Sequence, residues 1–190
     1  YEPWAGEPGQ CVNYAACHDN YTLYDKIRLT LPGAGEEEIE KRVKLAGALI
    51  LTSQGVPFLH AGMEFCRSKK GEGNSFKSSD LVNQIDWSLK STYKEVAGYY
   101  RKLVLLRRNH PVFRMPAADM IRRSLKFAKE YRPGVVAYLI DRNEISDDYS
   151  QVLLIFNGLS EDVETAIPDG RYVVIASGGE INEKGIGMVE

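Results

Sequence analysis

The feature that most constrains the fold is a strand-helix-strand pattern in the first third of the chain. Residues 12–17 are a short, mostly apolar run, and residues 56–60 form a second such run with Pro57 near its start, where a strand tolerates proline. Between them, apolar residues recur at helical spacing over residues 36–53, after three glutamates that suit the positive end of a helix dipole. Two buried strands joined by a helix are the repeating unit of a parallel α/β fold, and the sequence predicts this unit here.

A long segment without periodicity follows the second predicted strand. Residues 67–86 are rich in Gly, Ser, Asn, Lys and Asp, and α/β barrels keep their active-site loops after strands. Residues 69–74 resemble a glycine-rich phosphate loop only loosely, because Gly, Lys and Ser or Thr do not occur in the required order, and a flexible loop is predicted instead. The next helix is predicted over residues 91–109, closed by Pro111.

From residue 119 onward the sequence consists of short alternating or β-branched runs separated by turn residues. Such runs predict an antiparallel sheet or sandwich. The predicted strands are residues 121–127, 135–141, 152–157, 163–167 and 172–176, with turns at residues 132–134, 157–158 and 168–170. The junction falls near residues 115–118, so we expect an α/β domain over residues 1–116 and an all-β domain over residues 117–190.

The charge of the chain excludes some classes of partner. A formal net charge of -2 and an isoelectric point near 6.0 provide no basic surface for nucleic acid or an anionic membrane. No apolar stretch approaches the roughly 20 residues that a membrane helix requires. Three scattered cysteines do not suggest a disulfide framework, which favours a reducing, cytoplasmic compartment. The chain does not begin with Met, so we expect it to be part of a longer protein. Whether that protein carries a secretion signal stays open.

No metal ion or cofactor is predicted. The cysteine and histidine residues in the first third lack the close paired spacing of a structural zinc site, so buried or incidental thiols are the expected interpretation. These residues are Cys11, Cys17, His18, His60 and Cys66. No acidic cluster has the oxygen-ligand pattern of a calcium site, and no nucleotide-binding glycine loop or nucleophile elbow occurs.

The polar cluster His18-Asp19-Asn20 follows directly after the first predicted strand. Two ionisable groups at the C-terminal end of a buried strand have to be solvated in a cleft or hydrogen-bonded. Taken by itself, a His-Asp pair is more often a structural hydrogen-bonding pair than a catalytic one, and the spacing alone leaves both interpretations open.

Four segments, in order and in register, resemble the α-amylase superfamily of glycoside hydrolases. Residues 12–26 look like its fourth sequence region, in the version of pullulanase-type debranching enzymes, which continues past His-Asp-Asn into a Thr-Leu-aromatic-Asp-Lys stretch. Residues 51–65 resemble the eighth barrel strand and its approach, residues 67–87 the loop after it, and residues 100–114 the last barrel helix and its exit. The chain departs from the common pattern at Tyr21, Met63 and Phe76.

The resemblance implies a fold and a set of site residues. The fold is the C-terminal part of a (β/α)8 TIM barrel, contributing the last two strand-helix units, followed by an antiparallel β-sandwich. Enzymes of this family are retaining glycosidases with two catalytic carboxyl groups about 5 Å apart. Asp19 corresponds to neither and is implied to be the third carboxylate, which stabilises the transition state. His18 is implied to hydrogen-bond the same sugar ring, and Asn20, Arg67 and Asn74 are implied to be weaker contacts to neighbouring sugars.

No stretch of the chain resembles the regions that carry the nucleophile and the acid/base. The resemblance therefore implies a parent enzyme that cleaves α-1,6 links in pullulan, glycogen or limit dextrin, and a 190-residue chain that is inactive alone. Isoamylase, branching enzyme and amylase are rival assignments, disfavoured by the residues after Asn20 and by residues 67–87. An alternative of another class is a non-catalytic structural or sugar-binding module. Barrel strands without their neighbours have open edges, so self-association through these edges is also expected.

Overall fold

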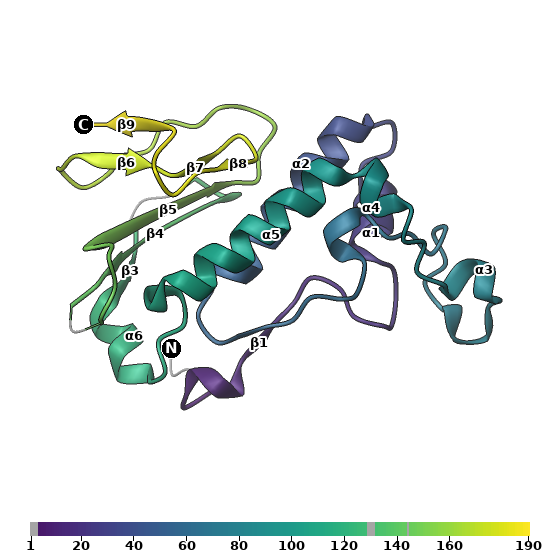
Figure 1. The fold of residues 1–190 in the computed structure, drawn as a ribbon, viewed down its shortest axis with the longest axis horizontal. Coiled ribbons are helices and arrows are strands. Elements are labelled where there is room, and N and C mark those ends of the chain that lie inside the picture. Colours follow the sequence, from purple (N-terminus) through teal and green to yellow (C-terminus); the bar gives the residue numbers. More distant parts are fainter. Residues whose placement is uncertain (1–3, 129–131, 144) are drawn as a thin grey trace. The chain divides into compact units, whose positions relative to one another are not determined.

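A computed structural model of the chain describes residues 4–128, 132–143 and 145–190 (Figure 1). The chain divides into two compact units that alternate along the sequence. The helical unit consists of Val12–Leu51 and Pro57–Val104. The sheet unit consists of Tyr1–Cys11, Thr52–Val56 and Leu105–Glu190.

Two long helices dominate the helical unit, and both were predicted at nearly the same bounds. α2 spans Glu36–Thr52, with three glutamates in its first turn, and α5 spans Lys94–Asn109 and stops just before Pro111. No helix of the described residues is long and apolar enough to cross a membrane. The shorter helical segments are α1 (Leu23–Thr30), η2 (Met63–Phe65), η3 (Ser75–Lys77), α3 (Asp80–Asn83) and α4 (Leu89–Thr92).

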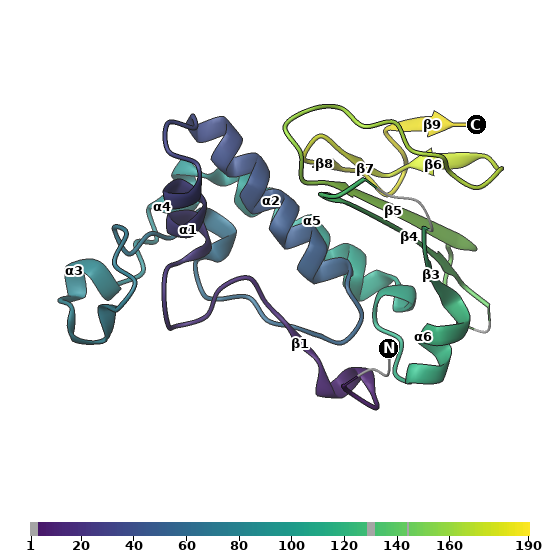
Figure 2. The ribbon, with the colours of Figure 1, turned by 180° about the vertical axis from the view of Figure 1, so that it is seen from behind.

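α2 and α5 lie side by side in both ribbon views (Figure 2). Tyr100 of α5 is buried, and its hydroxyl donates a hydrogen bond of 2.8 Å to the Val43 carbonyl of α2. A β-carbon at Gly47 would lie only 2.4 Å from Cζ of this ring. The tyrosine ring therefore lies against α2 at a position where only glycine fits.

The two predicted parallel strands are present but short. β1 (Val12–Asn13) pairs with β2 (Val56–Pro57), since the Val56 amide donates to the Cys11 carbonyl at 2.8 Å and the Phe58 amide donates to the Asn13 carbonyl at 2.9 Å. Donors and acceptors both advance along the chain, as a parallel pair requires. The strand-helix-strand order is thus confirmed.

The prediction that these strands are buried is wrong for one side of the pair. Val12, Tyr14, Val56 and Phe58 alternate along the two strands, and all four side chains are exposed. The Tyr14 and Phe58 rings touch edge to face, with centroids 6.1 Å apart. Among the described residues, nothing covers this apolar face.

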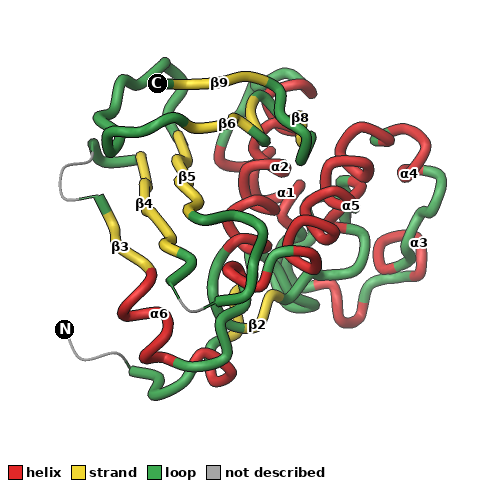
Figure 3. Tube along the Cα trace, turned by 60° about the vertical axis from the view of Figure 1, so that its left-hand side comes forward, coloured by secondary structure: helices red, strands yellow, loops and turns green. Residues whose placement is uncertain are grey.

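The described residues of the sheet unit form three antiparallel sheets (Figure 3). The largest has the order β3-β4-β5, with β4 paired to β5 from Val135 opposite Asn157 to Asp141 opposite Gln151. Both faces of this sheet contribute buried residues, with Val135 and Ala137 on one face and Ile140 and Phe156 on the other. The strands and short helices of this unit are η1 (Pro8–Gln10), η4 (Pro111–Phe113), α6 (Ala118–Ser124), β3 (Leu125–Phe127), β4 (Val135–Asp141), β5 (Gln151–Asn157), β6 (Tyr172–Val174), β7 (Ala176–Ser177), β8 (Glu180–Ile181) and β9 (Gly187–Val189), with β6 paired to β9 and β7 to β8.

Two predicted strands are wrong in part or in whole. Residues 121–124 belong to helix α6, where Asp119 and Arg122 form an ion pair of 2.7 Å one turn apart, and only Leu125–Phe127 is a strand. Residues 163–167 alternate in burial as a strand would, yet they pair with no described strand. The remaining predicted strands are confirmed at or near their bounds.

Candidate functional site

The residues after β1 form an exposed polar loop in the helical unit. His18 Nε2 lies 3.4 Å from Asp19 Oδ2, and the two side chains are 85% and 75% exposed. Asn20 is also exposed, and its φ of 60° lies in the left-handed region, which asparagine tolerates better than most residues. The three predicted site residues therefore stand together on one loop and face solvent.

The side chain of Lys69 hydrogen-bonds to the backbone of this loop. Its Nζ donates hydrogen bonds to the carbonyl oxygens of His18 at 2.6 Å and of Asn20 at 3.5 Å. Only 4% of the residue is exposed. A lysine this buried needs hydrogen-bond partners, and the two carbonyl oxygens supply them. The predicted flexible loop is therefore wrong at Lys69, whose side chain crosses from one chain segment to another.

Asp25, in the first turn of α1, fixes the backbone around Lys69. Its Oδ2 accepts a hydrogen bond from the Lys69 amide at 2.7 Å, and its Oδ1 accepts one from the Ser68 hydroxyl at 2.6 Å. The Asp25 amide in turn donates to Thr22 Oγ1, the N-cap of α1, at 3.1 Å. Asp25 is 4% exposed, so its carboxylate acts inside the unit rather than at the surface.

Arg67 is mostly buried and donates to backbone carbonyls. Its Nη1 donates to the Ala61 carbonyl at 3.1 Å, and its Nη2 donates to the carbonyl of Asn83. A β-carbon at Gly62, where φ is +92°, would lie 2.6 Å from the Arg67 β-carbon, so glycine is needed on both counts. In this structure Arg67 joins the two ends of the loop that follows β2.

His60 lies near the positively charged side chains of Arg67 and Lys69. Burial lowers the pKa of His60, and the positive charges of Arg67 and Lys69, together with His18, lower it further. Arg67 Nη1 lies 3.4 Å from His60 Nε2, and because arginine has no acceptor, Nε2 has to be the unprotonated acceptor. The neutral imidazole and the lowered pKa agree.

Asn74, the last predicted site residue, is exposed on the stretch just before η3. The backbone amide of Asn74 donates a hydrogen bond to Glu72 Oε1 at 2.8 Å. The neighbouring Gly73 lies against the Tyr21 ring, at whose Cζ an added β-carbon would come within 3.0 Å. The structure thus brings residues 72–74 beside the loop that carries the other candidates.

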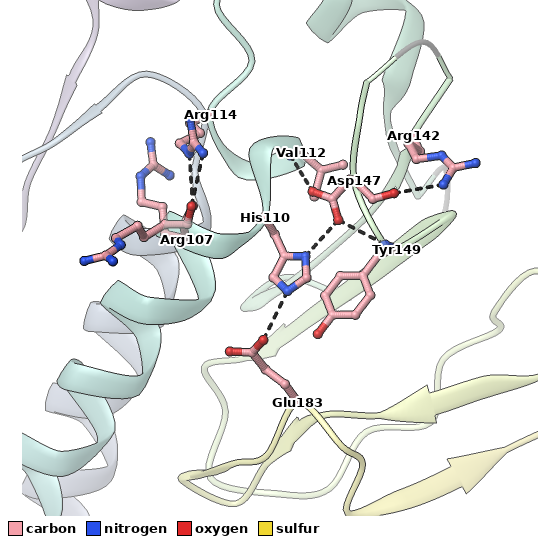
Figure 4. Close-up of polar contacts among 9 residues, drawn as sticks. Arg107, His110, Val112, Arg114, Arg142, Asp147, Tyr149 and Glu183 are labelled. Carbon is pink, nitrogen blue, oxygen red and sulfur yellow. Dashed lines mark hydrogen bonds and ion pairs between the residues drawn. The ribbon is translucent and has the colours of Figure 1, made fainter.

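A second histidine cluster, which the sequence analysis did not find, lies in the sheet unit (Figure 4). His110 Nδ1 is 2.8 Å from Asp147 Oδ1, and His110 Nε2 is 3.2 Å from Glu183 Oε2. The Tyr149 ring stacks on the imidazole at 3.8 Å. Since the carboxylate partners lie 37 and 73 residues away along the chain, no local spacing signals the cluster.

Two groups of this cluster have shifted pKa values. Burial raises the pKa of Asp147, but hydrogen bonds from His110 and from the backbone amides of Tyr149 and Val112 outweigh it and leave the pKa below its ordinary value. Burial, with the nearby carboxylates of Glu183 and Asp147, raises the pKa of Tyr149 to about 12. Asp147 is therefore held as a buried carboxylate beside the imidazole.

Among the described residues, no group of three His, Cys, Asp or Glu side chains is placed to hold a metal ion. The three cysteines are free thiols. Burial raises the pKa of Cys66 to about 12, with smaller contributions from Glu40 and Glu36, so this thiol is not a reactive thiolate at neutral pH.

The comparisons with known proteins agree on one class. Residues 121–180 match the family described as the pullulanase all-beta domain. The pullulanase of Bacillus subtilis (strain 168) is 40% identical over 168 residues, which cover 88% of this chain and 23% of that protein. The solved pullulanase from Bacillus acidopullulyticus superposes with a TM-score of 0.92 at 36% identity, covering 97% of this chain and 23% of that chain. Type I pullulanase from Bacillus subtilis complexed with maltose gives 0.91 at 35% identity, covering 97% and 26%.

These matches, together with the parallel strand pair and the all-β part, define the class: the chain is a member of the α-amylase superfamily, as residues 12–26 predicted. Within that superfamily it belongs with the pullulanases and corresponds to the C-terminal portion of such a protein. The chain spans 23% to 26% of the length of these relatives.

Proposed function

We propose that this chain is the C-terminal portion of a debranching glycoside hydrolase that cleaves α-1,6-glucosidic bonds in pullulan, glycogen or limit dextrin with retention of configuration. The observation that carries the proposal is the exposed His18-Asp19-Asn20 loop after β1, held by the buried Lys69, in a chain similar to pullulanases. The relative solved with maltose supports an α-glucan as the partner of this loop.

In this proposal residues 1–116 contribute the last two strand-helix units of a (β/α)8 barrel, and residues 117–190 form an antiparallel β-sandwich domain. The parallel pair β1-β2 joined by α2, with α5 after β2, supports the barrel assignment. The exposed apolar residues on these strands support it as well, because a complete barrel would cover them.

Asp19 has the role of the third carboxylate. As an anion beside the positive charge that develops on the sugar ring, it stabilises the oxocarbenium-like transition state, and its hydrogen bonds to sugar hydroxyls strengthen there. His18 hydrogen-bonds the same ring, while Asn20, Arg67 and Asn74 are weaker contacts to neighbouring sugars. The nucleophile and the acid/base come from sequence outside these residues, so the chain alone is expected to be inactive.

The test is pullulan hydrolysis by the full-length protein, by its Asp19→Asn variant and by this chain alone. Asn keeps the shape of Asp19 and removes its charge, so we expect a loss in kcat of about 10³-fold. Asp169→Asn, an exposed aspartate in the sheet unit, is the matched control and should keep full activity. Full activity in Asp19→Asn would remove the assigned role, and activity of this chain alone would show that its catalytic carboxylates are within it.

Self-association of the isolated chain is part of the same proposal, because β1 and β2 each pair on one side only among the described strands. Sedimentation of the isolated chain should show dimers or larger species that dissociate on dilution. A clean monomer with native-like helical content would contradict association through these edges.

A further inference from the structure

The buried pair Lys69 and Asp25 has no place in the proposed chemistry, yet it contacts the loop that carries Asp19. Lys69 Nζ bonds the carbonyl of the residue before Asp19, at 2.6 Å, and lies 3.5 Å from the carbonyl of the residue after it. Anchors on both sides of one residue fix where its β-carbon points. The Asp19 side chain itself stays 75% exposed, so the anchors orient it without covering it.

Among the described residues, the other contacts of this loop are weaker, such as the Cys17 thiol at 3.9 Å from the Asp19 carbonyl. The His18-Asp19 contact, at 3.4 Å between two exposed side chains, is of the kind that contributes little to stability. Asn20 has a left-handed backbone, which asparagine adopts at low cost, so this conformation does not by itself hold the loop in place. The strong hydrogen bond to this loop therefore comes from Lys69.

Lys69 is in turn held by α1. Asp25 binds the Lys69 amide and the Ser68 hydroxyl, and Ser68 Oγ accepts from the Lys70 amide at 2.8 Å. This hydrogen-bonded turn sets the direction in which the Lys69 side chain leaves the backbone. Because Lys70 has a φ of +57°, the turn needs such support.

We propose that Lys69, held by Asp25, is a positioning residue that aims the Asp19 carboxylate at the sugar ring undergoing hydrolysis. The proposal rests on the proposed function for its catalytic consequence. It requires no contact between Lys69 and the glucan, since Lys69 is only 4% exposed and its Nζ bonds backbone carbonyls. Misplacing a reacting group by an ångström lowers turnover much more than it lowers binding.

The kinetic test uses the full-length protein with Lys69→Met, which keeps the apolar stem and removes the amine. We expect kcat on pullulan to fall about 100-fold while KM changes little, because the other glucan contacts are retained. Lys70→Met, at the exposed neighbour, is the matched control and should match the unaltered protein. Lys69→Arg retains N–H donors and should restore most of the turnover.

Coupling to Asp19 separates positioning from a general loss of stability. In the Asp19→Asn background, Lys69→Met should cause no further fall in kcat, since there is no carboxylate left to aim. A fall that multiplies the effect of Asp19→Asn in full would overturn the proposal, as would unchanged kcat in folded Lys69→Met. If Lys69→Met does not fold, Ser68→Ala, which removes one hydrogen bond to Asp25, is expected to give a smaller loss in kcat with the fold intact.

Amide hydrogen exchange tests the same contact without reference to activity. Exchange at residues 18–22 should become faster in Lys69→Met and stay unchanged in Lys70→Met. If the unaltered protein does not hydrolyse α-1,6-glucans, the proposed function fails, and the exchange experiment still decides whether Lys69 holds the loop. Unchanged exchange in Lys69→Met would overturn the inference whatever the activity.

Discussion

The chain contains two histidine-aspartate pairs in opposite surroundings. His18 and Asp19 are neighbours in sequence, lie 3.4 Å apart and have side chains 85% and 75% exposed. His110 and Asp147 are 37 residues apart, lie 2.8 Å from each other and have side chains 6% and 0% exposed. The same two groups thus form a solvated pair at the site and a buried pair in the sheet unit.

The difference in surroundings decides what each pair can do. An exposed ion pair contributes about 0–1 kcal/mol, so replacing one member of the His18-Asp19 pair should cost little stability. Removing one partner of a buried pair costs about 3–5 kcal/mol, because the other is left without compensation. Loss of one member is therefore expected to cost more stability in the buried pair than in the exposed pair.

The largest test of this contrast is the stability of Asp147→Ala compared with that of Asp19→Ala. Asp147→Ala leaves the buried His110 facing only Glu183, so we expect the free energy of unfolding to fall by about 3 kcal/mol or more. Asp19→Ala should change it by less than about 0.5 kcal/mol. Urea unfolding of the full-length protein, with Asp148→Ala as the exposed neighbouring control, measures both. Equal effects at the two sites would contradict the comparison.

The second largest expected effect is the loss of stability at acid pH through the buried pair. The pKa of Asp147 lies below its ordinary value of 3.8, so the unfolded state binds the proton first as the pH falls. The stabilisation by this carboxylate is therefore complete above the ordinary value and is lost as the pH falls through the lowered pKa. Besides His110, the charged groups around it are Glu183, Asp148 and Arg142, whose Nη1 donates to the Asp147 carbonyl.

The measurement is the urea midpoint of the sheet unit's unfolding at neutral pH and at several values below 4. Asp147→Asn should be less stable at neutral pH and should lose less stability on acidification than the unaltered protein does. Asp148→Asn, next to it and exposed, should show the unaltered acid response. The same acid response in Asp147→Asn as in the unaltered protein would assign the loss to other carboxylates.

The contrast between the pairs also explains what sequence reasoning could reach. α2, α5, β4 and β5 follow from spacing that is local, so their bounds were predicted closely. Residues 121–127 were predicted as one strand, but 121–124 belong to α6, an outcome that spacing alone does not decide. The exposed pair was found because its members are consecutive and belong to a recognisable segment.

The hydrogen bonds of Lys69 and those of His110 could not be predicted, because they join segments that are far apart in the sequence. Lys69 reaches its carbonyl partner across 51 residues and its amide reaches Asp25 across 44. The sequence around Lys69 is rich in Gly, Ser and Lys, a composition that favours a flexible loop when read locally. Only the fold supplies the buried partners that turn such a residue into a fixed one.

The smallest test concerns His60, which lies beside the site and senses its positive charges. Its pKa is below the ordinary 6.5 because of burial first, and then because of Arg67, Lys69 and His18. Removing the amine in Lys69→Met should therefore raise the pKa of His60 toward that value, while burial keeps it below. NMR titration of labelled histidines, assigned with His60→Gln, measures the change, and Lys70→Met should leave it unaltered. An unchanged pKa in Lys69→Met would mean that the Lys69 charge does not contribute to the lowered pKa of His60.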